Sequence, residues 1–171
     1  MQTIRVMRFL SPSKSRFPIH FFSSTPSSNS PHLLLSVGHV LRFSRRFMDQ
    51  DVACFAEVTG DYNPVHLDSE FAKGVGGFDR GRVVHGMLVA SLFPSIIASN
   101  FPGAVYVSQD LKFKLPVYVG DEVAAEVQAI NIRQIKKRFI VKFTTKCFTN
   151  EFHPAVDGEA VAVLPTLNLT K

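Results

Sequence analysis

The stretch GMLVASLFPSIIASN, residues 86–100, constrains the fold most strongly, because nearly every side chain in it is apolar. It has the length of a four-turn helix, and a helix that is apolar all round has to be buried on all sides. Pro94 lies in its middle and predicts a kink there, or an end to the first half, since proline has no N–H for the helical ladder. The rest of the chain therefore has to cover this helix.

The segments on either side predict strands that supply this cover. Residues 37–47 and 104–132 alternate apolar and polar side chains, with a turn at VGDE, and residues 137–148 and 158–165 predict two further strands. We expect an α+β domain in which the long helix packs against an antiparallel sheet of five or six strands. The positions expected to face inward or to carry the apolar alternation are Val40, Phe43, Phe47, Leu111, Phe113, Leu115, Val123, Ala125, Val127, Phe139, Val141, Phe143, Thr145 and Cys147.

A short helix is predicted over residues 50–59, where apolar side chains recur at helical spacing. Asp49 is its expected N-cap and Gly60 its expected C-terminal stop. The segment from Asp61 to Gly81 predicts an irregular loop, and its four glycines allow the backbone to approach a ligand or to flex over one.

Length and composition limit the chain to one ordinary folded domain. It has 171 residues, 46% of them hydrophobic, and 16 Phe, so global disorder is excluded. The two cysteines, Cys54 and Cys147, are too few for a disulfide scaffold and are too far apart to suggest a metal ladder. They predict buried thiols in a reducing compartment.

The net charge of +5 is unevenly distributed along the chain. Residues 1–35 carry Arg5, Arg8, Lys14 and Arg16 and no acidic residue, so the remainder is close to neutral and a nucleic-acid-binding function is not favoured. This leader is rich in Ser and has no apolar run long enough to span a bilayer. Its composition predicts a mitochondrial transit peptide, with a plastid one less favoured and a merely disordered tail as the alternative. Residues 36–171 then form the single folded domain.

The segment TGDYNPVHLDSEFA, residues 59–72, brings Asp61 and His66 close together around a stiff Asn63-Pro64 turn. A carboxylate and an imidazole held in this way can bind one water and move protons at neutral pH. The alternative is ordinary turn chemistry, because Asp, Asn and Pro are common turn formers.

The segment VVHGML adds a second polar feature at the start of the predicted buried helix. If the helix begins at Gly86, its first N–H groups are unpaired and form an oxyanion site that a substrate carbonyl can approach closely. His85 is either a second polar wall of the site or a buried core histidine. The alternative for Gly86 is a tight turn without a ligand.

The two segments suit one reaction class. The addition or removal of water across a double bond conjugated to a thioester needs proton transfer and stabilisation of enolate charge. Asp61 and His66 supply the first, and the N–H of Gly86 supplies the second.

From about residue 38 to residue 165 the chain resembles the MaoC-like, R-specific enoyl hydratase/dehydratase family. The residues that carry the resemblance are TGDYNPVHLD, VVHGMLVASLF, LKFKLPVYVGDEV and GEAVAVL. The resemblance implies a hot-dog fold, a homodimer with sheets joined edge to edge, and acyl pockets near the interface. It also implies a catalytic pair of Asp61 and His66, a loop-ordering role for Asn63 and an oxyanion donor at Gly86. Some bacterial members carry a serine near the catalytic Asp where this chain has Pro94, and Ser91 or Ser95 are alternative donors.

The resemblance implies reversible dehydration of a (3R)-3-hydroxyacyl thioester to a trans-2-enoyl thioester, without a metal or redox cofactor. The predicted leader favours substrates bound to acyl carrier protein, in fatty acid synthesis in the mitochondrial matrix. The closest alternative is an R-specific hydratase of CoA thioesters. Alternatives of another class are a hot-dog thioesterase and a non-catalytic hot-dog subunit.

Two further groups of residues have alternative explanations. The basic residues Arg133, Lys136, Lys137 and Arg138 form either a solvated hairpin or a dock for an acidic acyl carrier protein or for CoA phosphates. Asp61, His66 and Asp68 could be drawn as a metal site, but no second His or Glu cluster supports one, and we predict none.

Overall fold

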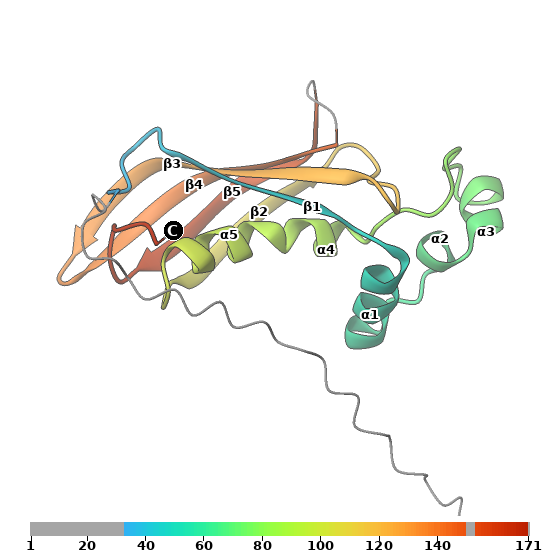
Figure 1. Cartoon of the computed structure of the whole chain (residues 1–171), viewed down its shortest axis with the longest axis horizontal. Helices are drawn as coiled ribbons and strands as arrows, with labels where there is room; N and C mark the ends of the chain where they lie inside the picture. Colours follow the sequence, from blue (N-terminus) through green and yellow to red (C-terminus); the bar gives the residue numbers. More distant parts are fainter. Residues whose placement is uncertain (1–32, 150–152, 171) are drawn as a thin grey trace, which may run out of the picture. The chain divides into compact units, whose positions relative to one another are not determined.

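The computed structural model describes residues 33–149 and 153–170, which contain five strands and five helices (Figure 1). The predicted leader lies almost entirely outside these residues, although Leu35, at its end, is buried in the core. Among the described residues no helix is long and apolar enough to cross a membrane. The elements are β1 (Val40–Arg46), α1 (Asp49–Thr59), α2 (Pro64–Leu67), α3 (Ser69–Gly74), α4 (Gly86–Ala90), α5 (Leu92–Asn100), β2 (Val105–Phe113), β3 (Glu122–Ile135), β4 (Arg138–Phe148) and β5 (Pro154–Leu164).

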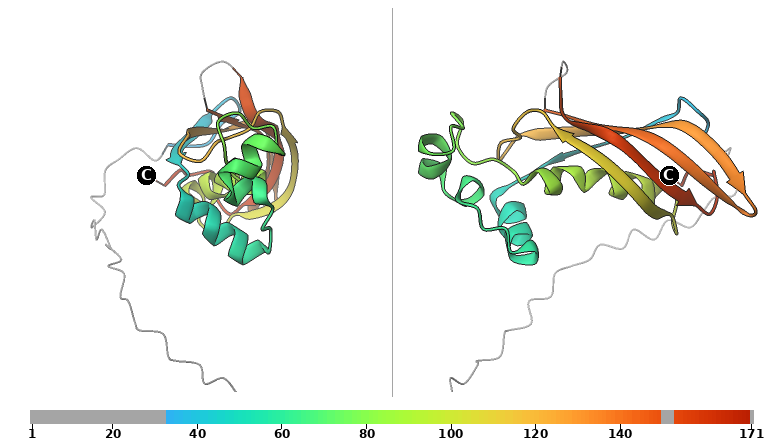
Figure 2. Two further views of the ribbon diagram at one scale, coloured as in Figure 1. Left: turned by 90° about the vertical axis from the view of Figure 1, so that its right-hand side faces the viewer. Right: turned by 180° about the vertical axis from the view of Figure 1, so that it is seen from behind.

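The five strands form one antiparallel sheet with the order β1-β3-β4-β5-β2, and α4 and α5 run along one of its faces (Figures 1 and 2). Side chains of these two helices and of the covered face of the sheet make one hydrophobic core. The expected α+β architecture, with a central helix against five or six strands, is confirmed. The inward faces predicted for β3 and β4 are also confirmed, with Phe139 partly and the other positions fully buried.

The central helix is interrupted once, between α4 and α5. Helix α4 ends at Ala90 and α5 begins at Leu92, so Pro94 lies in the first turn of α5. Its ring nitrogen has no hydrogen to donate to the carbonyl of Ala90, which is the acceptor four residues earlier. The predicted interruption is therefore confirmed. Each half buries one face, on which Val89 and Phe93 are fully shielded from solvent. The expected burial on all sides is wrong, because the opposite face is exposed at Met87, Ser91, Ser95, Ala98 and Ser99.

The inward positions predicted for the two edge strands are wrong in part. Leu41 in β1 and Phe47, just after its end, are buried, whereas Val40 is only partly buried and Phe43 is exposed. Val40 points to the opposite face from Leu41 because side chains alternate along a strand. None of the residues of β2 is fully buried, and Phe113 is 53% exposed. An edge strand has a neighbour on one side only, so its side chains gain less cover than those of β3 and β4.

Two predictions about the first helix need a correction. Asp49 is the first residue of α1 and Met48 is its N-cap, while the carboxylate of Asp51 accepts a hydrogen bond of 2.9 Å from the N–H of Met48. The stop at Gly60 is confirmed, since Gly60 adopts the left-handed conformation with φ of 76°. Cys54 on this helix is exposed, so its predicted burial is wrong. Cys147 is buried as predicted, and burial raises the pKa of its thiol to about 12.

The segment from Asp61 to Gly81 was expected to be irregular, and this prediction is wrong because it contains α2 and α3. The side chain of Asn63 accepts a hydrogen bond of 3.3 Å from the N–H of Val65 and so caps α2, whose first residue is Pro64. The Asp68 carboxylate caps α3 by accepting from two backbone N–H groups at 2.9 and 3.0 Å. Both caps follow known helix-start preferences for Asn, Asp and Pro.

Candidate active site

His66 lies on α2, where it is half-buried and points toward the start of α4. Its Nδ1 lies 2.8 Å from the carbonyl oxygen of Val83. A carbonyl can only accept, so Nδ1 carries the proton and Nε2 of the neutral ring has a free lone pair. Burial lowers the pKa of His66 below its ordinary value of 6.5, and the neighbouring His85 lowers it further, against the opposing effects of Val83 and Asp61. The ring is therefore held as a neutral base at pH 7.

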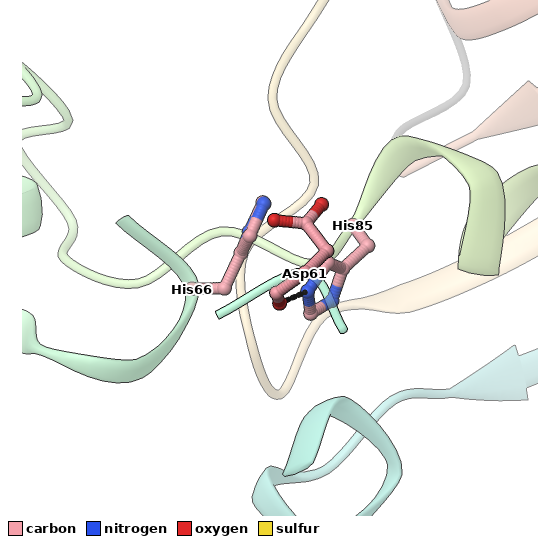
Figure 3. A group of neighbouring side chains, drawn as sticks. All are labelled: Asp61, His66 and His85. Atoms are coloured by element: carbon pink, nitrogen blue, oxygen red, sulfur yellow. Dashed lines mark hydrogen bonds between the residues drawn. The ribbon is translucent and has the colours of Figure 1, made fainter. Parts of the chain in front are cut away.

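Asp61 lies in the short link between α1 and α2 and is exposed. Its Oδ1 accepts a hydrogen bond of 3.3 Å from the N–H of Asn63, which holds the carboxylate against its own turn. Nitrogen or oxygen atoms of Asp61, His66 and His85 all lie within 4.8 Å of one another (Figure 3). The five-residue separation in the sequence thus becomes a close pair in space, as predicted.

His85 is the buried partner of this pair, with 2% of its surface exposed. Its Nε2 donates a hydrogen bond of 3.0 Å to the backbone carbonyl of Asp61, drawn as a dashed line in Figure 3. Its ring stacks on His66 with a centroid distance of 3.8 Å and lies 5.0 Å from the ring of Phe55. Its Nδ1 is buried and has no hydrogen-bond partner among the described residues. His85 therefore contacts both members of the pair.

Asn63 and Gly86 complete the predicted set and line one pocket of about 520 Å³ together with His66. The remaining wall is mostly apolar and includes Val84, Val89, Phe113 and Val156. A Cβ atom at Gly86 would lie 2.7 Å from the ring of Phe113, so a side chain here would displace that ring. A pocket with apolar walls and a few polar groups at one end suits an acyl chain that carries a polar head.

The N–H groups at the start of α4 are available to a ligand. Those of Leu88 and Val89 bond to the carbonyl of His85, whereas those of Gly86 and Met87 have no partner among the described residues. Within the residues that the structure describes, neither Ser91 nor Ser95 forms a hydrogen bond with Asp61. The hydroxyl of Ser91 donates to the carbonyl of Leu88 at 2.6 Å instead, and no hydrogen bond of the Ser95 side chain is formed within the described part of the chain.

The arrangement does not favour a zinc ion, although Asp61, His66 and His85 each offer one ligand atom within 4.8 Å of the others. One nitrogen of each ring bonds to a backbone carbonyl, which leaves one nitrogen of each ring as a possible ligand atom. The two rings are stacked with an interplanar angle of 30°. Stacked rings direct their in-plane lone pairs along nearly parallel planes, not toward one ion at about 2.0–2.1 Å from both. Asp68 is occupied in capping α3.

The four basic residues proposed as a carrier dock lie elsewhere in the fold. Arg133, Lys136, Lys137 and Arg138 surround the turn between β3 and β4, at the end of the sheet away from α2 and α3 (Figure 1). The structure thus brings Asp61, Asn63, His66, His85 and Gly86 together and leaves the basic residues apart.

The role of Val83 and the hydrogen bond from His85 were not foreseen from the sequence. Both contacts involve a backbone carbonyl, which every residue has, so no side-chain motif marks them. The caps of α2 and α3 do have a signal, since Asn63-Pro64 and Asp68 are typical starts of helices.

The chain is similar to known proteins over most of its length. Residues 35–151 match the model of the MaoC like domain. The mitochondrial 3-hydroxyacyl-[acyl-carrier-protein] dehydratase FERN of Solanum lycopersicum is 54% identical over 148 residues, which cover 86% of this chain and 87% of that protein. The corresponding mitochondrial dehydratase of Arabidopsis thaliana is also 54% identical, over 84% of this chain and 86% of that protein.

More distant relatives include a protein of known structure. The (R)-specific enoyl-CoA hydratase of Aeromonas caviae is 47% identical over 133 residues, or 77% of this chain and 96% of that protein. The solved structure of the (R)-hydratase from this bacterium superposes with a TM-score of 0.71 over 77% of this chain and 98% of that one. The expected hot-dog architecture is confirmed by this likeness, and the chain belongs to the MaoC-like domain family.

Proposed function

We propose that this protein is a hydro-lyase that interconverts (3R)-3-hydroxyacyl thioesters and trans-2-enoyl thioesters. The observation that carries the proposal is the neutral His66 ring, whose Nδ1 bonds to Val83 and whose Nε2 is free beside the carboxylate of Asp61. His66 lines a mostly apolar pocket that also contains Gly86 at the start of α4. The relatives that are most similar among those compared are named as dehydratases and hydratases of thioesters.

In the dehydration direction, Nε2 of His66 takes the proton from C2 of the substrate. The resulting imidazolium, next to Asp61, delivers that proton to the C3 hydroxyl on the same face, and the C3–O bond breaks to release water. The Asp61 carboxylate accepts a hydrogen bond from the hydroxyl and so orients it. One proton and one hydroxyl leave the substrate as water, and the enzyme returns to its initial protonation state.

Negative charge accumulates on the thioester oxygen when C2 loses its proton. The free N–H groups of Gly86 and Met87 are the donors that stabilise this enolate oxygen. The absence of a side chain at Gly86 keeps the approach to these groups open. Asn63 holds the start of α2, and His85 holds the backbone of Asp61 and one face of His66. These two residues position the reacting groups and do not touch the substrate in this mechanism.

We assign the carrier to an acyl carrier protein in the mitochondrial matrix. Two relatives at 54% identity are named as mitochondrial acyl-carrier-protein dehydratases, whereas the CoA-specific hydratases are 47% identical or less. The acid-free, arginine-containing residues 1–35 support import by a transit peptide, with residues 36–171 as the mature domain. Fatty acid synthesis in mitochondria is then the pathway that uses the enzyme, and CoA thioesters are the alternative substrates.

The functional unit proposed is a homodimer formed through β2. This strand is at one edge of the sheet, and apolar side chains such as Val105, Val107 and Phe113 are more than half exposed. The opposite edge, β1, carries three arginines, a common protection against unwanted strand pairing. Pairing β2 with β2 of a second copy would satisfy its free backbone groups and bury these side chains.

The test is an assay of the purified full chain with trans-2-butenoyl thioesters of acyl carrier protein and of CoA. Loss of enoyl absorbance without release of free thiol is expected, with higher kcat/KM for the acyl carrier protein thioester. Release of thiol without hydration would identify a thioesterase and contradict the proposal. A folded protein inert toward both thioesters would favour a non-catalytic subunit.

A further inference from the structure

The turn between β3 and β4 carries a groove that the proposed chemistry does not use. A pocket of about 530 Å³ lies there, and we call it the hairpin groove. Its floor includes Ile140 and Val163, which pair across β4 and β5 on the sheet face away from α5. Its other lining residues are Ile135, Lys136, Lys137 and Arg138.

The basic residues of the groove form no ion pair with an acidic side chain of the described part of the chain. Among the described residues, seven other lysines and arginines form ion pairs, for example Lys114 with Asp157 and Lys142 with Glu159. Lys136, Lys137, Arg138 and the nearby Arg133 form none within the same part of the chain. An apolar floor with an uncompensated basic rim is complementary to an acidic protein surface that carries a few apolar side chains.

Lys136 also occupies a conformation that lysine rarely adopts. Its φ is 54°, and it is the only residue other than glycine with positive φ in the described part of the chain. Asn or Gly is preferred at such a turn position, because a long side chain there is strained. A lysine in this place suggests that its charge is retained for a function.

Within one subunit the groove is far from the active site. Phe113 in the pocket wall lies in the same row across the sheet as Val156, Cys147 and Ala125. Ten residues of β3 separate Ala125 from Ile135, which corresponds to about 33 Å at the rise of a strand. A carrier bound at the groove would thus lie far from the active site of the subunit that binds it.

Antiparallel pairing of β2 with β2 of a second copy would bring the groove of one subunit close to the active site of the other. If the nine residues pair over their full length, Phe113 lies opposite Val105 of the partner subunit. Val105 pairs with Val163, and Val163 with Ile140, both in the groove. With strands about 4.8 Å apart, these two groove residues of the partner are roughly 10 and 14 Å from Phe113.

We propose that the hairpin groove of each subunit docks the acidic acyl carrier protein that delivers substrate to the active site of the other subunit. The proposal rests on the dehydratase function and the β2 dimer proposed above. The carrier body lies on the outer face of the sheet, and its flexible arm enters at the end of β2, where the pocket lining includes Lys114 and Leu115. The dimer is then required for substrate delivery, even though both reacting side chains come from one chain.

The first test compares two double charge reversals in the full-length protein. Lys136→Glu with Lys137→Glu alters the groove, and Lys73→Glu with Lys146→Glu is the matched control, because these lysines are exposed and also lack ion pairs among the described residues. The dissociation constant of mitochondrial acyl carrier protein is measured by titration. The KM is measured with the trans-2-butenoyl thioester of the same carrier. We expect both constants to rise about tenfold or more in the groove variant only, and the effect to shrink at high salt.

Turnover of the carrier-free trans-2-butenoyl-N-acetylcysteamine separates docking from chemistry. Wild-type activity on this small thioester with unchanged carrier binding in the groove variant overturns the docking proposal. Absence of hydration by the wild type on every thioester would refute the proposed function, and the binding titration would still decide whether the groove docks the carrier. The docking proposal would also be overturned if the control variant lost carrier binding as strongly as the groove variant.

The second test asks which subunit receives the substrate. Mixed dimers are purified through two different tags, with Asp61→Asn in one subunit and the groove reversal in the other. If docking serves the partner, the intact active site is supplied by the intact groove, so about half of the wild-type kcat and the wild-type KM are expected. A KM raised as in the groove homodimer would show docking to the same subunit, and a monomeric protein would equally contradict the proposal.

Discussion

The tautomer of His66 links the site's geometry to its chemistry. A single contact from Nδ1 to the carbonyl of Val83 leaves Nε2 free, and burial lowers the pKa of the ring below 6.5. The base is active when neutral, so activity is present above this pKa and is lost as the pH falls through it. We expect kcat/KM on a carrier-free enoyl or hydroxyacyl thioester to be flat near pH 7 and to decrease with a midpoint below 6.5. A midpoint at or above 6.5 would contradict this assignment.

The contacts of His85 lead to a second prediction about a single residue. Its Nδ1 is buried without a partner among residues 33–149 and 153–170, which costs stability, while its Nε2 bonds to Asp61 and its ring lies on His66. His85→Phe should therefore lower kcat about 10- to 100-fold, with KM little changed, and should not reduce the free energy of unfolding by more than about 1 kcal/mol.

Two readouts separate this positioning role from a general structural one. Loss of the neighbouring imidazole raises the pKa of His66, so the midpoint of the pH profile should move upward in His85→Phe. His85→Gln keeps an amide donor for the carbonyl of Asp61 and should recover part of kcat. Unfolding of His85→Phe, or a pH profile like that of the wild type, would contradict the role.

The sequence predicted which residues meet in the site better than it predicted how they meet. Asp61, His66 and Gly86 are marked by unusual combinations of residue types, and the structure brings them to one place. The contacts of His66 with Val83 and of His85 with Asp61 use backbone carbonyls 17 and 24 residues away. Such contacts depend on the folded path of the chain and leave no local pattern.

At the scale of elements, long periodic segments were predicted well and short capped ones poorly. The central helix lies in a long, nearly all-apolar stretch, and β3 and β4 alternate apolar and polar side chains over 14 and 11 residues. Helices α2 and α3 have four and six residues, too few for a periodic signal, and depend on the caps at Asn63 and Asp68. The residue types at these two helix starts are typical of caps, but the glycines that follow in the sequence favoured the prediction of a loop.

One substitution in the β3–β4 turn is expected to raise the stability of the protein and to weaken its binding of the carrier. Lys136→Asn relieves the strain of positive φ and removes one charge from the hairpin groove. We expect the free energy of unfolding, measured by urea denaturation, to rise by about 0.5–1 kcal/mol. Binding of the acyl carrier protein should weaken in the same variant. A lower free energy of unfolding in this variant would contradict the inferred backbone strain at Lys136. Unchanged binding of the carrier would argue against a docking role for this lysine.

At the scale of the whole molecule, the two edges of the sheet differ in charge and exposure. Arginines line β1, and exposed apolar side chains line β2. Val105→Lys with Val107→Lys would place like charges along the proposed dimer edge. Sedimentation should then detect monomers, and activity on the carrier-bound substrate should fall. A matched pair on the other edge, Phe43→Lys with Ser44→Lys, should leave the dimer intact. Dimers that persist in the β2 variant would refute the interface.

The measurement that tests the central claim most directly is the rate of trans-2-butenoyl thioester hydration by the wild type, Asp61→Asn and His66→Gln. If His66 transfers the proton and Asp61 orients the hydroxyl, each variant loses about 10²- to 10⁴-fold in kcat. Asp61 is exposed in the link between α1 and α2, and His66 is half-buried on the short helix α2, so the melting temperature should change little. Variants that remain folded and retain wild-type kcat would contradict the account.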